Sequence, residues 1–579
     1  MVTKNDIIGI LEEIGVILEI KGENPFKTRA YANAARTLEG LEEDFHTLVA
    51  EERLDQVKGI GKAIAEKISR LVNEGDLPYY NDLKASIPPG LLDMLDIPGM
   101  GPKKIKAVHK NLNISNIEEL KASCEEGKLQ ILDGFGKKTE EKILKGIQNR
   151  EAYMARHLWW EAHAIAKPLV EALRELPEVE KAEIAGSLRR KKETVGDLDF
   201  LASSGSPAPI MDWFTKRPEV QEVTTKGETK ASVRLTGGLQ ADLRVVPPEQ
   251  YAFALHHFTG SKEHNVALRS RSLQKGYSLS EWGLKSEKAN KAPQNIFSEE
   301  DLFEFLGLPL IPPELREGRE EIERLEGENP PLLIEESDLK GVFHNHTKAS
   351  DGQSSLREMA HAAAKMGWEY LGISDHSKAS FQADGLNEEK LIRQIAEIRE
   401  YNASPDRELH LFAGIECDIL SDGSLDFEDE VLAECDYVIA AIHSRSGQKG
   451  PDETARLIAA MENPLVTMIA HPTGRLLLQR EPYDLDHRKI IDAAAGNGVV
   501  IEINSHPRRL DMDWRWWRYA REKGVRASIN PDAHHSDHFA YTLAGINIAR
   551  KGWLQREDVI NTMGLKDVSD FLRKKMSHD

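Results

Sequence analysis

The chain has 579 residues, which at roughly 100 to 200 residues per domain predicts several domains and excludes a single small core. Hydrophobic residues make up 40% and charged residues 30%, without an apolar run of about 20 residues, so the composition is typical of a soluble globular protein and excludes a membrane-spanning one. Three cysteines are too few for a disulfide framework or a zinc ribbon, and the start MVTKNDIIGI lacks the apolar core of a signal peptide. We therefore expect a protein of the reducing cytoplasm.

The net charge of -20 at first argues against nucleic acid as a partner, because phosphate binders usually present basic surfaces. The charge is unevenly distributed, however, and about 14 of the 20 excess negative charges lie after Gly318. The N-terminal part is close enough to neutral for local basic faces to hold a phosphate backbone. The acidity of the C-terminal part is consistent with carboxylate metal ligands.

The first 150 residues have the periodicity of helices. From Asp6 to about Arg150 apolar residues recur at spacings of three and four, as in IIGILEEIGVILEI, which predicts an all-α region. One pattern occurs three times in it: VKGIGKAIAEKI from Val57, IPGMGPKKIKAV from Ile97 and LDGFGKKTEEKI from Leu132. Each copy predicts a helix, a Gly-x-Gly turn and a second helix.

The glycines of these turns allow left-handed backbone, and they leave the amides that open the second helix accessible to a phosphate oxygen. A single copy is equally well explained as a plain turn in a helical hairpin, but three copies favour DNA. The pattern resembles the helix-hairpin-helix motif of proteins that bind the DNA backbone without reading its sequence. The residues expected to contact DNA are Gly59, Gly61, Lys62, Gly99, Gly101, Lys103, Lys104, Gly134, Gly136, Lys137 and Lys138.

The rest of the chain predicts two further kinds of fold. From Ala152 to about Gly307 strand-like runs alternate with helices, which predicts an α+β region, and the charged segment PPELREGREEIERLEGENPP then predicts an interdomain connection with a short helix. Beyond it, seven short apolar runs alternate with helical stretches, which predicts a parallel β/α barrel. In six of the seven runs a His, Asp or Glu lies at the C-terminal end of the strand, where barrel active sites are assembled.

Three carboxylates in the α+β region predict a metal site. Asp197 and Asp199 in GDLDF share one strand face, and Asp242 in LQADLRVV lies in a run that could pair alongside. Converging carboxylates repel one another unless cations lie between them, and two Mg²⁺ ions about 4 Å apart would activate a 3′-hydroxyl and stabilise a leaving pyrophosphate. A lone Asp-x-Asp is more often a solvated pair, but AGSLRR upstream adds a Gly-Ser turn, with Ser187 and Arg190 suited to a triphosphate.

The segments GSLRRKKETVGDLDFL, ADLRVVPPEQYAFAL and HHFTGSKEHNVALRSRSLQKGYSLSEWGL resemble the nucleotidyltransferase core of family X DNA polymerases, the group that includes polymerase beta. The resemblance extends from Met1 to about Pro312. It implies metal binding by Asp197, Asp199 and Asp242, with Asp242 activating the primer hydroxyl. It also implies triphosphate contacts by Ser187, Arg190 and Gly196, and nucleotide or minor-groove contacts by Phe258, Gly260, Asn265 and Arg269. Gly186 and His257 complete the expected nucleotide-binding set.

Three positions qualify this resemblance. The family usually has Tyr where this chain has His257, which puts discrimination against ribonucleotides in doubt. Gln240 stands where polymerase beta has an arginine that supports the third carboxylate, so that Asp242 would be held less firmly. Lys67 matches the lysine that forms a Schiff base with abasic sugars in some members. A solvated or phosphate-binding lysine is the favoured alternative, because a nucleophilic lysine needs a depressed pKa.

The barrel region carries nine side chains of metal-ligand type: His344, His346, Asp351, His376, Glu416, His443, His471, Asp532 and His534. A lone histidine is more often a core or surface residue, but six histidines with three carboxylates are not independent accidents. Imidazole together with carboxylate suits Mn²⁺, Zn²⁺ or Fe²⁺, and nine ligands are too many for one ion, so we expect two to three ions. A bound water would become hydroxide near neutral pH, which predicts phosphoester hydrolysis.

From about Asp338 to Asp579 the sequence resembles the PHP (polymerase and histidinol phosphatase) domain, a distorted seven-stranded (β/α)₇ barrel with a trinuclear site. All nine positions of its ligand pattern are filled. Asp375 either orients a ligand or holds backbone at a strand end. Basic residues that could hold DNA at the barrel mouth, against the alternative of solvated surface charges, are Lys348, Lys378, Arg445, Arg475, Arg508 and Arg509.

A family X core joined to a PHP domain resembles the bacterial family X polymerases that couple gap filling with Mn²⁺-dependent 3′→5′ exonuclease activity. The resemblance implies a DNA repair enzyme, including base excision repair, that takes gapped or primed DNA and dNTPs. It implies Mg²⁺ or Mn²⁺ at the carboxylate triad and Mn²⁺, Zn²⁺ or Fe²⁺ at the barrel. We expect a cytoplasmic, nucleoid-associated monomer that acts without a membrane, with repair proteins as further candidate partners.

On this interpretation the chain divides as follows: 1–85 helical DNA-binding domain with the first hairpin, 86–150 helix-hairpin-helix region, 151–247 nucleotidyltransferase palm, 248–312 thumb-like nucleotide-selection subdomain, 313–336 linker and 337–579 PHP domain. Two alternatives stay open. In one, the barrel is a small-molecule phosphatase fused to a DNA-binding repair scaffold. In the other, the whole chain is a repair scaffold with degenerate catalytic domains, which the full carboxylate triad and ligand set oppose.

Overall fold

The computed structural model describes the chain except for residues 1–3, 40–47, 50, 52, 58, 98, 155, 287–294, 444–451 and 577–579. The chain forms two compact units, Met1–Ala155 and Arg156–Asp579. Among the described residues, no helix is both long and apolar enough to cross a membrane. Arg445, one of the basic residues expected at the barrel mouth, lies outside the described residues.

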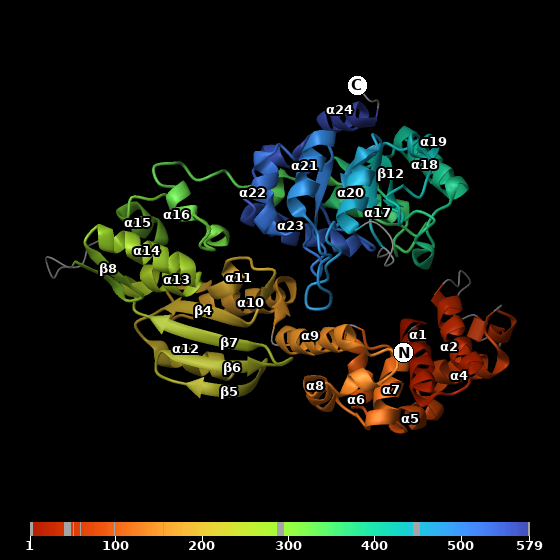
Figure 1. The fold of residues 1–579 in the computed structure, drawn as a ribbon. Coiled ribbons are helices and arrows are strands. Elements are labelled where there is room, and N and C mark those ends of the chain that lie inside the picture. Colours follow the sequence, from red (N-terminus) through yellow and green to blue (C-terminus); the bar gives the residue numbers. More distant parts are fainter. Residues whose placement is uncertain are drawn as a thin grey trace. The chain divides into compact units, whose positions relative to one another are not determined.

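The first unit is built from helices (Figure 1). α1 (Lys4–Lys21) packs on α2 (Pro25–Glu39), and their apolar residues belong to one core that continues through the rest of the unit. The other α-helices are α4 (Lys62–Glu74), α5 (Pro78–Ala85), α6 (Gly90–Asp93), α7 (Pro102–Leu112), α8 (Ile117–Glu125) and α9 (Lys137–Met154). The all-α region predicted from the helical periodicity is confirmed.

Each Gly-x-Gly turn joins a short 3₁₀ helix to an α-helix. The 3₁₀ helices are η1 (Leu54–Gln56), η2 (Met94–Asp96) and η3 (Lys128–Ile131), followed by α4, α7 and α9. The first glycine of each turn has left-handed backbone, with φ of 109° at Gly59, 93° at Gly99 and 81° at Gly134. A residue with a Cβ atom adopts this conformation only with strain. The 3₁₀ segments before the turns are three or four residues long, the usual length of a 3₁₀ helix, and η2 directly continues α6.

In the second unit five strands form a mixed sheet, here called the central sheet. Its order is β2 (Lys181–Ile184), β4 (Asp197–Ser203), β7 (Gln240–Val246), β6 (Lys230–Leu235) and β5 (Val220–Lys226). β4 and β7 run parallel, and the other pairs are antiparallel. Leu198 and Phe200 of β4 face a core shared with α10 (Trp159–Arg174) and α12 (Pro207–Thr215). Because side chains alternate along a strand, Asp197 and Asp199 lie on the opposite face.

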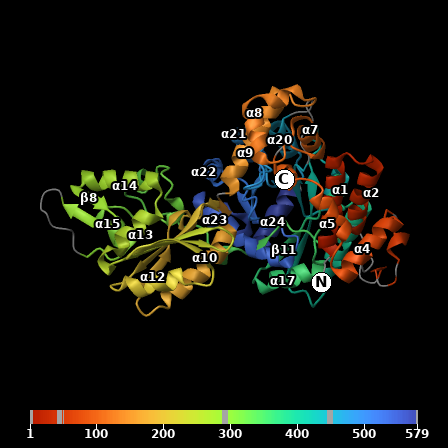
Figure 2. The same cartoon turned by 90° about the horizontal axis from the view of Figure 1, so that it is seen from below.

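A small helical subdomain follows the central sheet. It contains α13 (Tyr251–Thr259), α14 (Lys262–Gln274), the hairpin β8 (Tyr277–Ser280) and β9 (Gly283–Ser286), and α15 (Glu299–Phe305). Figure 2 shows these elements grouped together, and their apolar residues share a separate core. The chain then continues through η5 (Pro313–Leu315), α16 (Glu321–Arg324) and η6 (Glu336–Asp338). Arg316 anchors this segment, because its buried guanidinium pairs with the Glu299 carboxylate.

Seven parallel strands form the barrel. They are β10 (Gly341–Val342), β11 (Tyr370–Ile373), β12 (His410–Asp418), β13 (Tyr437–Ala441), β14 (Val466–Ile469), β15 (Val500–Asn504) and β16 (Ala527–Asn530). Helices alternate with them (Figure 1): α17 (Leu356–Lys365), α18 (Glu388–Ala403), α19 (Asp429–Leu432), α20 (Glu453–Glu462), α21 (His487–Asn497), α22 (Trp514–Glu522) and α23 (Thr542–Lys551). After α23 and two short 3₁₀ helices, α24 (Leu565–Met576) is the last described element of the chain. All seven predicted strand runs are present.

The barrel closes through residues that follow its first and last strands. The Ala533 amide donates to the His344 carbonyl at 3.3 Å, and the His346 amide donates to the Ala533 carbonyl at 2.8 Å. Tyr437 is fully buried inside, and its hydroxyl donates to the carbonyls of Phe343 and Ile373. These bonds confirm the predicted seven-stranded barrel and draw the segment that carries His344 and His346 against the C-terminal end of β16.

The central sheet and the barrel meet at the segment Arg190–Glu193. The buried Lys551 ammonium of α23 donates to the Arg190 carbonyl at 2.9 Å and to the Glu317 carboxylate at 2.8 Å, and it lies 4.7 Å from the centre of the Trp514 ring. Burial lowers the pKa of Lys551, while the Glu317 charge opposes that shift. Lys551 therefore joins three parts of the unit through one desolvated charge.

We expect Lys551→Met to cost about 3–5 kcal/mol of stability, because a buried ion pair that loses one partner leaves an uncompensated charge. The measurement is the urea midpoint of the second unit's unfolding, followed by tryptophan fluorescence. Lys489→Met is the matched control, because the Lys489–Asp486 pair is solvent-exposed, with the Lys489 side chain 71% exposed. An equal shift in both variants would contradict a special role for the buried charge.

Candidate active sites

The three carboxylates of the central sheet share one face. In the parallel ladder between β4 and β7, Asp199 is the register partner of Asp242, and Asp197 is the partner of Gln240. Gly186, with φ of 61°, opens the short helix α11 (Gly186–Arg189) directly against Asp199, so that a Cβ atom there would lie 2.1 Å from the Asp199 Oδ2 atom. The structure therefore brings together the Gly-Ser turn and all three predicted carboxylates.

The electrostatics of this face favour a bound cation. Burial, followed by the charges of Asp197 and Asp242, raises the pKa of Asp199 to about 7. Burial and the Asp242 charge also raise the pKa of Asp197. Within the described part of the chain, every group of three or more ligand atoms that lie within 4.8 Å of one another belongs to the barrel, so the sheet carboxylates are spaced more widely. Three repelling carboxylates at neighbouring strand positions suit divalent cations shared with a phosphate ligand.

Asp242 has two partners on the sheet. The Gln240 amide donates to the Asp242 Oδ1 atom at 3.1 Å, and the Lys230 ammonium of β6 lies 3.0 Å from the Oδ2 atom. Gln240 was expected to hold Asp242 less firmly than an arginine would. The neighbouring strand supplies the missing positive charge through Lys230, a residue that the sequence pattern did not single out because it becomes a neighbour only through strand pairing.

The expected triphosphate ligands surround the same turn. Ser187 lies half-buried in α11, and Gly196 is exposed just before β4. Arg190 is engaged within the protein: its Nε atom lies 3.2 Å from the Glu317 carboxylate, and its Nη1 atom donates to the Thr259 carbonyl. Gly260 packs against this guanidinium, because a Cβ atom there would lie 3.1 Å from Arg190 Nη1.

The residues expected near the sugar and base form a linked set on α13 and α14. The Asn265 amide donates to the His257 carbonyl at 2.8 Å, and Arg269 donates to the Nδ1 atom of His257 at 3.0 Å. Burial, together with Arg269 and Arg244, lowers the pKa of His257. The Arg244 guanidinium lies over the Phe258 ring, with its central carbon 4.6 Å from the ring centre. Arg269 thus holds His257 as a neutral ring with its proton on Nε2.

The expected DNA contacts in the first unit lie at its surface. Lys62, Lys103, Lys137 and Lys138 are exposed at the first turns of α4, α7 and α9, and open space surrounds Gly61, Gly101 and Gly136. Lys104 lies over the Phe135 ring at 5.5 Å. The Lys67 ammonium donates to the Ala63 carbonyl at 3.0 Å and lies 4.9 Å from the Tyr79 ring centre. Each turn therefore presents bare backbone next to positive charge.

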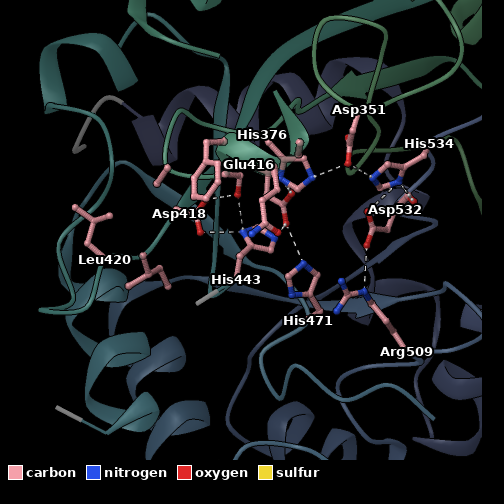
Figure 3. Close-up of a pocket in the computed structure, with 16 residues that line it drawn as sticks. Asp351, His376, Glu416, Asp418, Leu420, His443, His471, Arg509, Asp532 and His534 are labelled. Carbon is pink, nitrogen blue, oxygen red and sulfur yellow. Dashed lines mark hydrogen bonds and ion pairs between the residues drawn. The ribbon is translucent and has the colours of Figure 1, made fainter. Parts of the chain in front are cut away.

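The nine expected barrel ligands gather at the C-terminal ends of the strands, where Figure 3 shows His376, Glu416, His443, His471 and Asp532 directed toward one another. Glu416 is central: its carboxylate oxygens lie 2.8 Å from His376 Nδ1, 2.9 Å from His471 Nε2 and 3.3 Å from both His344 Nε2 and His443 Nε2. Among the described residues, four overlapping groups could hold ions: His346, Asp351, His376 and His534; His344, His346 and Glu416; His344, His471 and Asp532; and His376, Glu416 and His443.

Several donor atoms of this cluster have no other use in the fold. The Nε2 atom of His344 and the Nδ1 atoms of His346 and His471 are buried without a hydrogen-bond partner in the described part of the chain. Although burial opposes it, the charges of Glu502, Glu416 and Asp532 raise the pKa of His344 well above its ordinary value. Burial and the neighbouring His534 and His376 lower the pKa of His346 to about 3. Without metal, carboxylates packed this closely against imidazoles keep protons on some of the histidines. Bound cations would take the place of those protons, so the residues fit a multinuclear metal site.

Glu502, in the run GVVIEIN of β15, was missed because that run has no ligand-type residue at its end. It is fully buried, and its Oε1 atom lies 2.7 Å from His344 Nδ1 while its Oε2 atom accepts the His471 amide at 2.8 Å. The signal in the sequence is a lone acidic residue inside an apolar strand. By accepting a hydrogen bond from the Nδ1–H group, Glu502 leaves the His344 Nε2 lone pair facing the cluster.

We expect Glu502→Gln to weaken Mn²⁺ binding at the barrel by roughly 10- to 100-fold, as for other groups that orient a metal-ligating histidine. His344 and His471 contact different oxygens of Glu502, and glutamine replaces one of these oxygens with an NH₂ group, which cannot accept. Mn²⁺ titration by calorimetry measures the effect, with Glu408→Gln as control, because Glu408 pairs with His361 at the surface. Unchanged affinity in Glu502→Gln would show that the contact does not orient the ligand.

Asp375 holds a loop instead of a ligand ring. It accepts from the Thr347 amide and hydroxyl, both at 2.7 Å, from the Ser350 hydroxyl at 2.5 Å and from the Gln394 amide. Asp375 was expected either to orient a metal ligand or to hold backbone at a strand end, and the structure shows the second of these contacts. The loop that it fixes is the one that carries Asp351.

The basic residues expected at the mouth have different surroundings. Arg509 lines the cavity and lies 3.4 Å from the Asp532 carboxylate. Arg475 is buried instead, donating to the Arg509 carbonyl at 2.8 Å and lying 3.6 Å from Glu193 of the central-sheet segment. The expectation of a mouth position was therefore wrong for Arg475, whose stem and charge are used to join two parts of the unit. Lys348, Lys378 and Arg508 are exposed.

A cavity of about 470 Å³ lies over the cluster. Seven of the nine expected ligands line it, whereas His344 and His346 are fully buried behind them. Besides Arg509, the rest of the wall comes from the loop after β11 and from the end of β12, and it mixes apolar with polar side chains: Ala379, Ser380, Phe381, Gln382, Ala383, Asp418, Ile419 and Leu420. This volume lies within the roughly 300–1,000 Å³ of small-ligand sites, so it can admit a nucleotide but not a duplex.

Four protein families match parts of the chain. They are a helix-hairpin-helix domain at residues 2–77, a SAM-like helix-hairpin-helix tandem at residues 91–149, the DNA polymerase beta thumb at residues 254–317 and the PHP domain at residues 343–506. The first two cover the three Gly-x-Gly turns, and the last begins directly after β10 and covers the barrel strands β11 to β15. The families therefore follow the order of the observed folds.

Three relatives describe the range of the similarity. The DNA polymerase/3′-5′ exonuclease PolX of Bacillus subtilis is 39% identical over 573 residues, covering 99% of both chains. A probable phosphatase of Acetivibrio thermocellus is 32% identical over 202 residues, 33% of this chain and 78% of its own length. DNA polymerase lambda of Rattus norvegicus is 25% identical over 336 residues, 53% of this chain and 55% of its own length.

Proposed function

The chain belongs to the PolX family of bacterial DNA polymerase/3′-5′ exonucleases, and from this premise we propose that it fills short gaps in DNA at the central sheet and removes 3′-terminal nucleotides at the barrel mouth. It is a DNA polymerase that also has 3′-5′ exonuclease activity. The observation that carries the division of labour is that two separate sets of ligand-type side chains exist, one on β4 and β7 and the other around the barrel cavity. The two activities thus have separate sites in one chain.

At the central sheet, Asp197, Asp199 and Asp242 would hold Mg²⁺ or Mn²⁺. Ions bound there would clamp the triphosphate and make the primer hydroxyl more acidic. The primer 3′-oxygen attacks the α-phosphorus, its proton passes to Asp242, and pyrophosphate leaves. The Gly186–Ser187 turn and Arg190 bind the triphosphate, and Gly196 leaves room for it beside β4.

The α13–α14 set positions the nucleotide. Phe258 and Gly260 form the wall next to the sugar, and Asn265 and Arg269 fix His257 in place of the usual tyrosine. The His257 ring is smaller than the tyrosine that is usual at this position, so the backbone of the turn and the Phe258 ring would carry most of the discrimination between sugars. This supports a weaker discrimination against ribonucleotides than a tyrosine would give.

At the barrel, the nine expected ligands, of which His344 is the first and His534 the last in the sequence, would hold two to three Mn²⁺, Zn²⁺ or Fe²⁺ ions. Metal ions held there would make a water molecule acidic enough to attack near neutral pH and would neutralise charge on the phosphate. Arg509 adds a guanidinium at the cavity wall for the same phosphate. Hydrolysis adds water to the terminal phosphorus, breaks its bond to the 3′-oxygen and releases a nucleoside monophosphate.

The first unit would hold the DNA backbone by the exposed Gly-x-Gly turns and their lysines. We place Lys67 among the phosphate-binding lysines, because its ammonium is held by a backbone carbonyl and an aromatic ring. The proposed functional segments are the DNA-binding domain, the helix-hairpin-helix region, the palm, the thumb-like subdomain, the linker and the PHP domain, at residues 1–85, 86–150, 151–247, 248–312, 313–336 and 337–579. Gapped or primed DNA and dNTPs are the proposed ligands, and repair in the cytoplasm, including base excision repair, is the proposed setting.

A time course on a labelled one-nucleotide gap tests both activities. With dNTPs and Mg²⁺ or Mn²⁺ we expect the primer to lengthen by one nucleotide, and without dNTPs we expect it to shorten from its 3′ end. A probable phosphatase matches 33% of this chain, so a small phosphomonoester is included as a second substrate. Rapid hydrolysis of the monoester with an unshortened primer would favour the phosphatase alternative.

A further inference from the structure

We propose that Phe381 is a base-stacking platform that seats the 3′-terminal nucleobase of a DNA strand in the barrel cavity. The proposal rests on the assignment of 3′-end removal to the barrel. It adds the element that makes this site select a nucleotide instead of a simple phosphate ester.

Phe381 combines exposure with membership of the site. Its side chain is 79% exposed, although it lines the same cavity as His376, Glu416 and Asp532. A large ring kept in water beside a ligand cluster costs hydrophobic free energy that folding does not recover. An aromatic face at this position is suited to cover an apolar, planar part of the substrate while the cluster binds its phosphate.

The loop that carries Phe381 is tied to the ligand-bearing strands at both ends. The Ser377 amide donates to the Glu416 carbonyl at 3.0 Å, and the Leu386 amide donates to the His376 carbonyl at 2.7 Å. Gly385 closes the loop so tightly that a Cβ atom there would lie 1.9 Å from the Ser377 carbonyl oxygen. The base of the loop therefore has a fixed position relative to two of the expected ligands.

The tip of the loop is also held. Ser380, the residue before Phe381, accepts the amides of Ala383 at 2.9 Å and Gly385 at 3.2 Å with its carbonyl, and its hydroxyl donates to Asp418. The Ala379 amide donates to the Asp426 carboxylate at 2.6 Å. A ring on so constrained a turn, η7 (Phe381–Ala383), is a preorganised surface, which lowers the cost of ordering it around a ligand.

The chemistry of the cavity wall matches one class of ligand. The ligand imidazoles and carboxylates and Arg509 line one side. The side formed by this loop and the end of β12 carries Phe381, Ile419, Leu420 and two alanines, together with Ser380, Gln382 and Asp418. A nucleotide has a phosphate for the first side and a flat base for the second. Stacking on an aromatic ring tolerates every base, because each has a π-face, so the site would accept any 3′-terminal sequence.

Phe381→Ala tests the proposal on a labelled single-stranded oligonucleotide with Mn²⁺. Stacking contributes about 1–3 kcal/mol per base, so we expect kcat/KM for 3′-end removal to fall roughly 5- to 150-fold. Phe381→Trp should keep the wild-type rate, whereas Phe381→Leu, apolar but without a ring, should lose most of it. Phe297→Ala is the matched control, since Phe297 is 62% exposed but lies outside the barrel, and it should change nothing.

The same oligonucleotide with a tetrahydrofuran abasic residue at its 3′ end isolates the base. On this substrate the wild type and Phe381→Ala should differ by less than twofold, because there is no base to stack. A Phe381→Ala defect of equal size on both substrates, or no defect on either, would overturn the proposal. Unchanged gap filling and unchanged Mn²⁺ binding show that the variant is folded. A wild-type enzyme without any 3′-end removal would instead refute the assignment of the barrel to that reaction.

Discussion

Asp199→Ala is expected to lower nucleotide addition by roughly a thousandfold or more while leaving 3′-end removal intact, because metal clamps on a transferring phosphoryl group supply several kcal/mol of transition-state stabilisation. Asp199 lies in register with Asp242 and next to Asp197, so its removal breaks the three-carboxylate face. Single-nucleotide addition to a labelled gap measures the effect. The exonuclease assay on the same preparation reports the other site.

Asp199→Asn separates loss of charge from loss of fold. Burial and the charges of Asp197 and Asp242 already disfavour the Asp199 carboxylate, so a neutral amide of the same size should not destabilise the metal-free protein. It should nevertheless lose nucleotide addition as severely as the alanine variant. Asp212→Ala is the control, because Asp212 pairs with Lys216 and Lys226 at the surface and should keep full activity. Loss of both activities in a folded Asp199 variant would contradict two independent sites.

Glu416→Gln is expected to lower the exonuclease activity by roughly a thousandfold or more, as Asp199→Ala lowers nucleotide addition, and to leave nucleotide addition unchanged. The Glu416 carboxylate lies within 3.3 Å of nitrogens from four histidines and belongs to two of the four candidate metal groups. A neutral amide keeps the shape of the side chain but removes the negative charge with which Glu416 would hold cations in both groups. The barrel should therefore bind at least one metal ion fewer, which elemental analysis or anomalous scattering can count.

The metal count distinguishes this effect from a general one. Glu408→Gln, at the surface pair with His361, should keep both the metal and the exonuclease. If Glu416→Gln retained full metal content and full exonuclease activity, the barrel cluster would not be the hydrolytic site. Since Glu416 lies outside the central sheet, gap filling in the same variant should equal that of the wild type.

Much of both sites follows from strand periodicity alone. Asp197 and Asp199 share a face because side chains alternate along a strand, and the barrel ligands meet because parallel strands bring their C-terminal ends to one rim. Other members do not follow from periodicity. Glu502 lies within an apolar strand, so only the packed barrel shows that it contacts His344.

The order of local patterns along the chain was enough to identify the helical region with its three turns, the α+β region with its carboxylates and the barrel with its ligands, since each depends on residues close in sequence. Tertiary structure alone decided the pairings between distant segments. Lys230 reaches Asp242 by strand pairing, Arg475 leaves the barrel mouth for a buried contact with Glu193, and a tied loop sets Phe381 at the cavity wall. The physical reason is that periodicity reports which way a side chain points, whereas its partner depends on which surfaces the whole chain buries together.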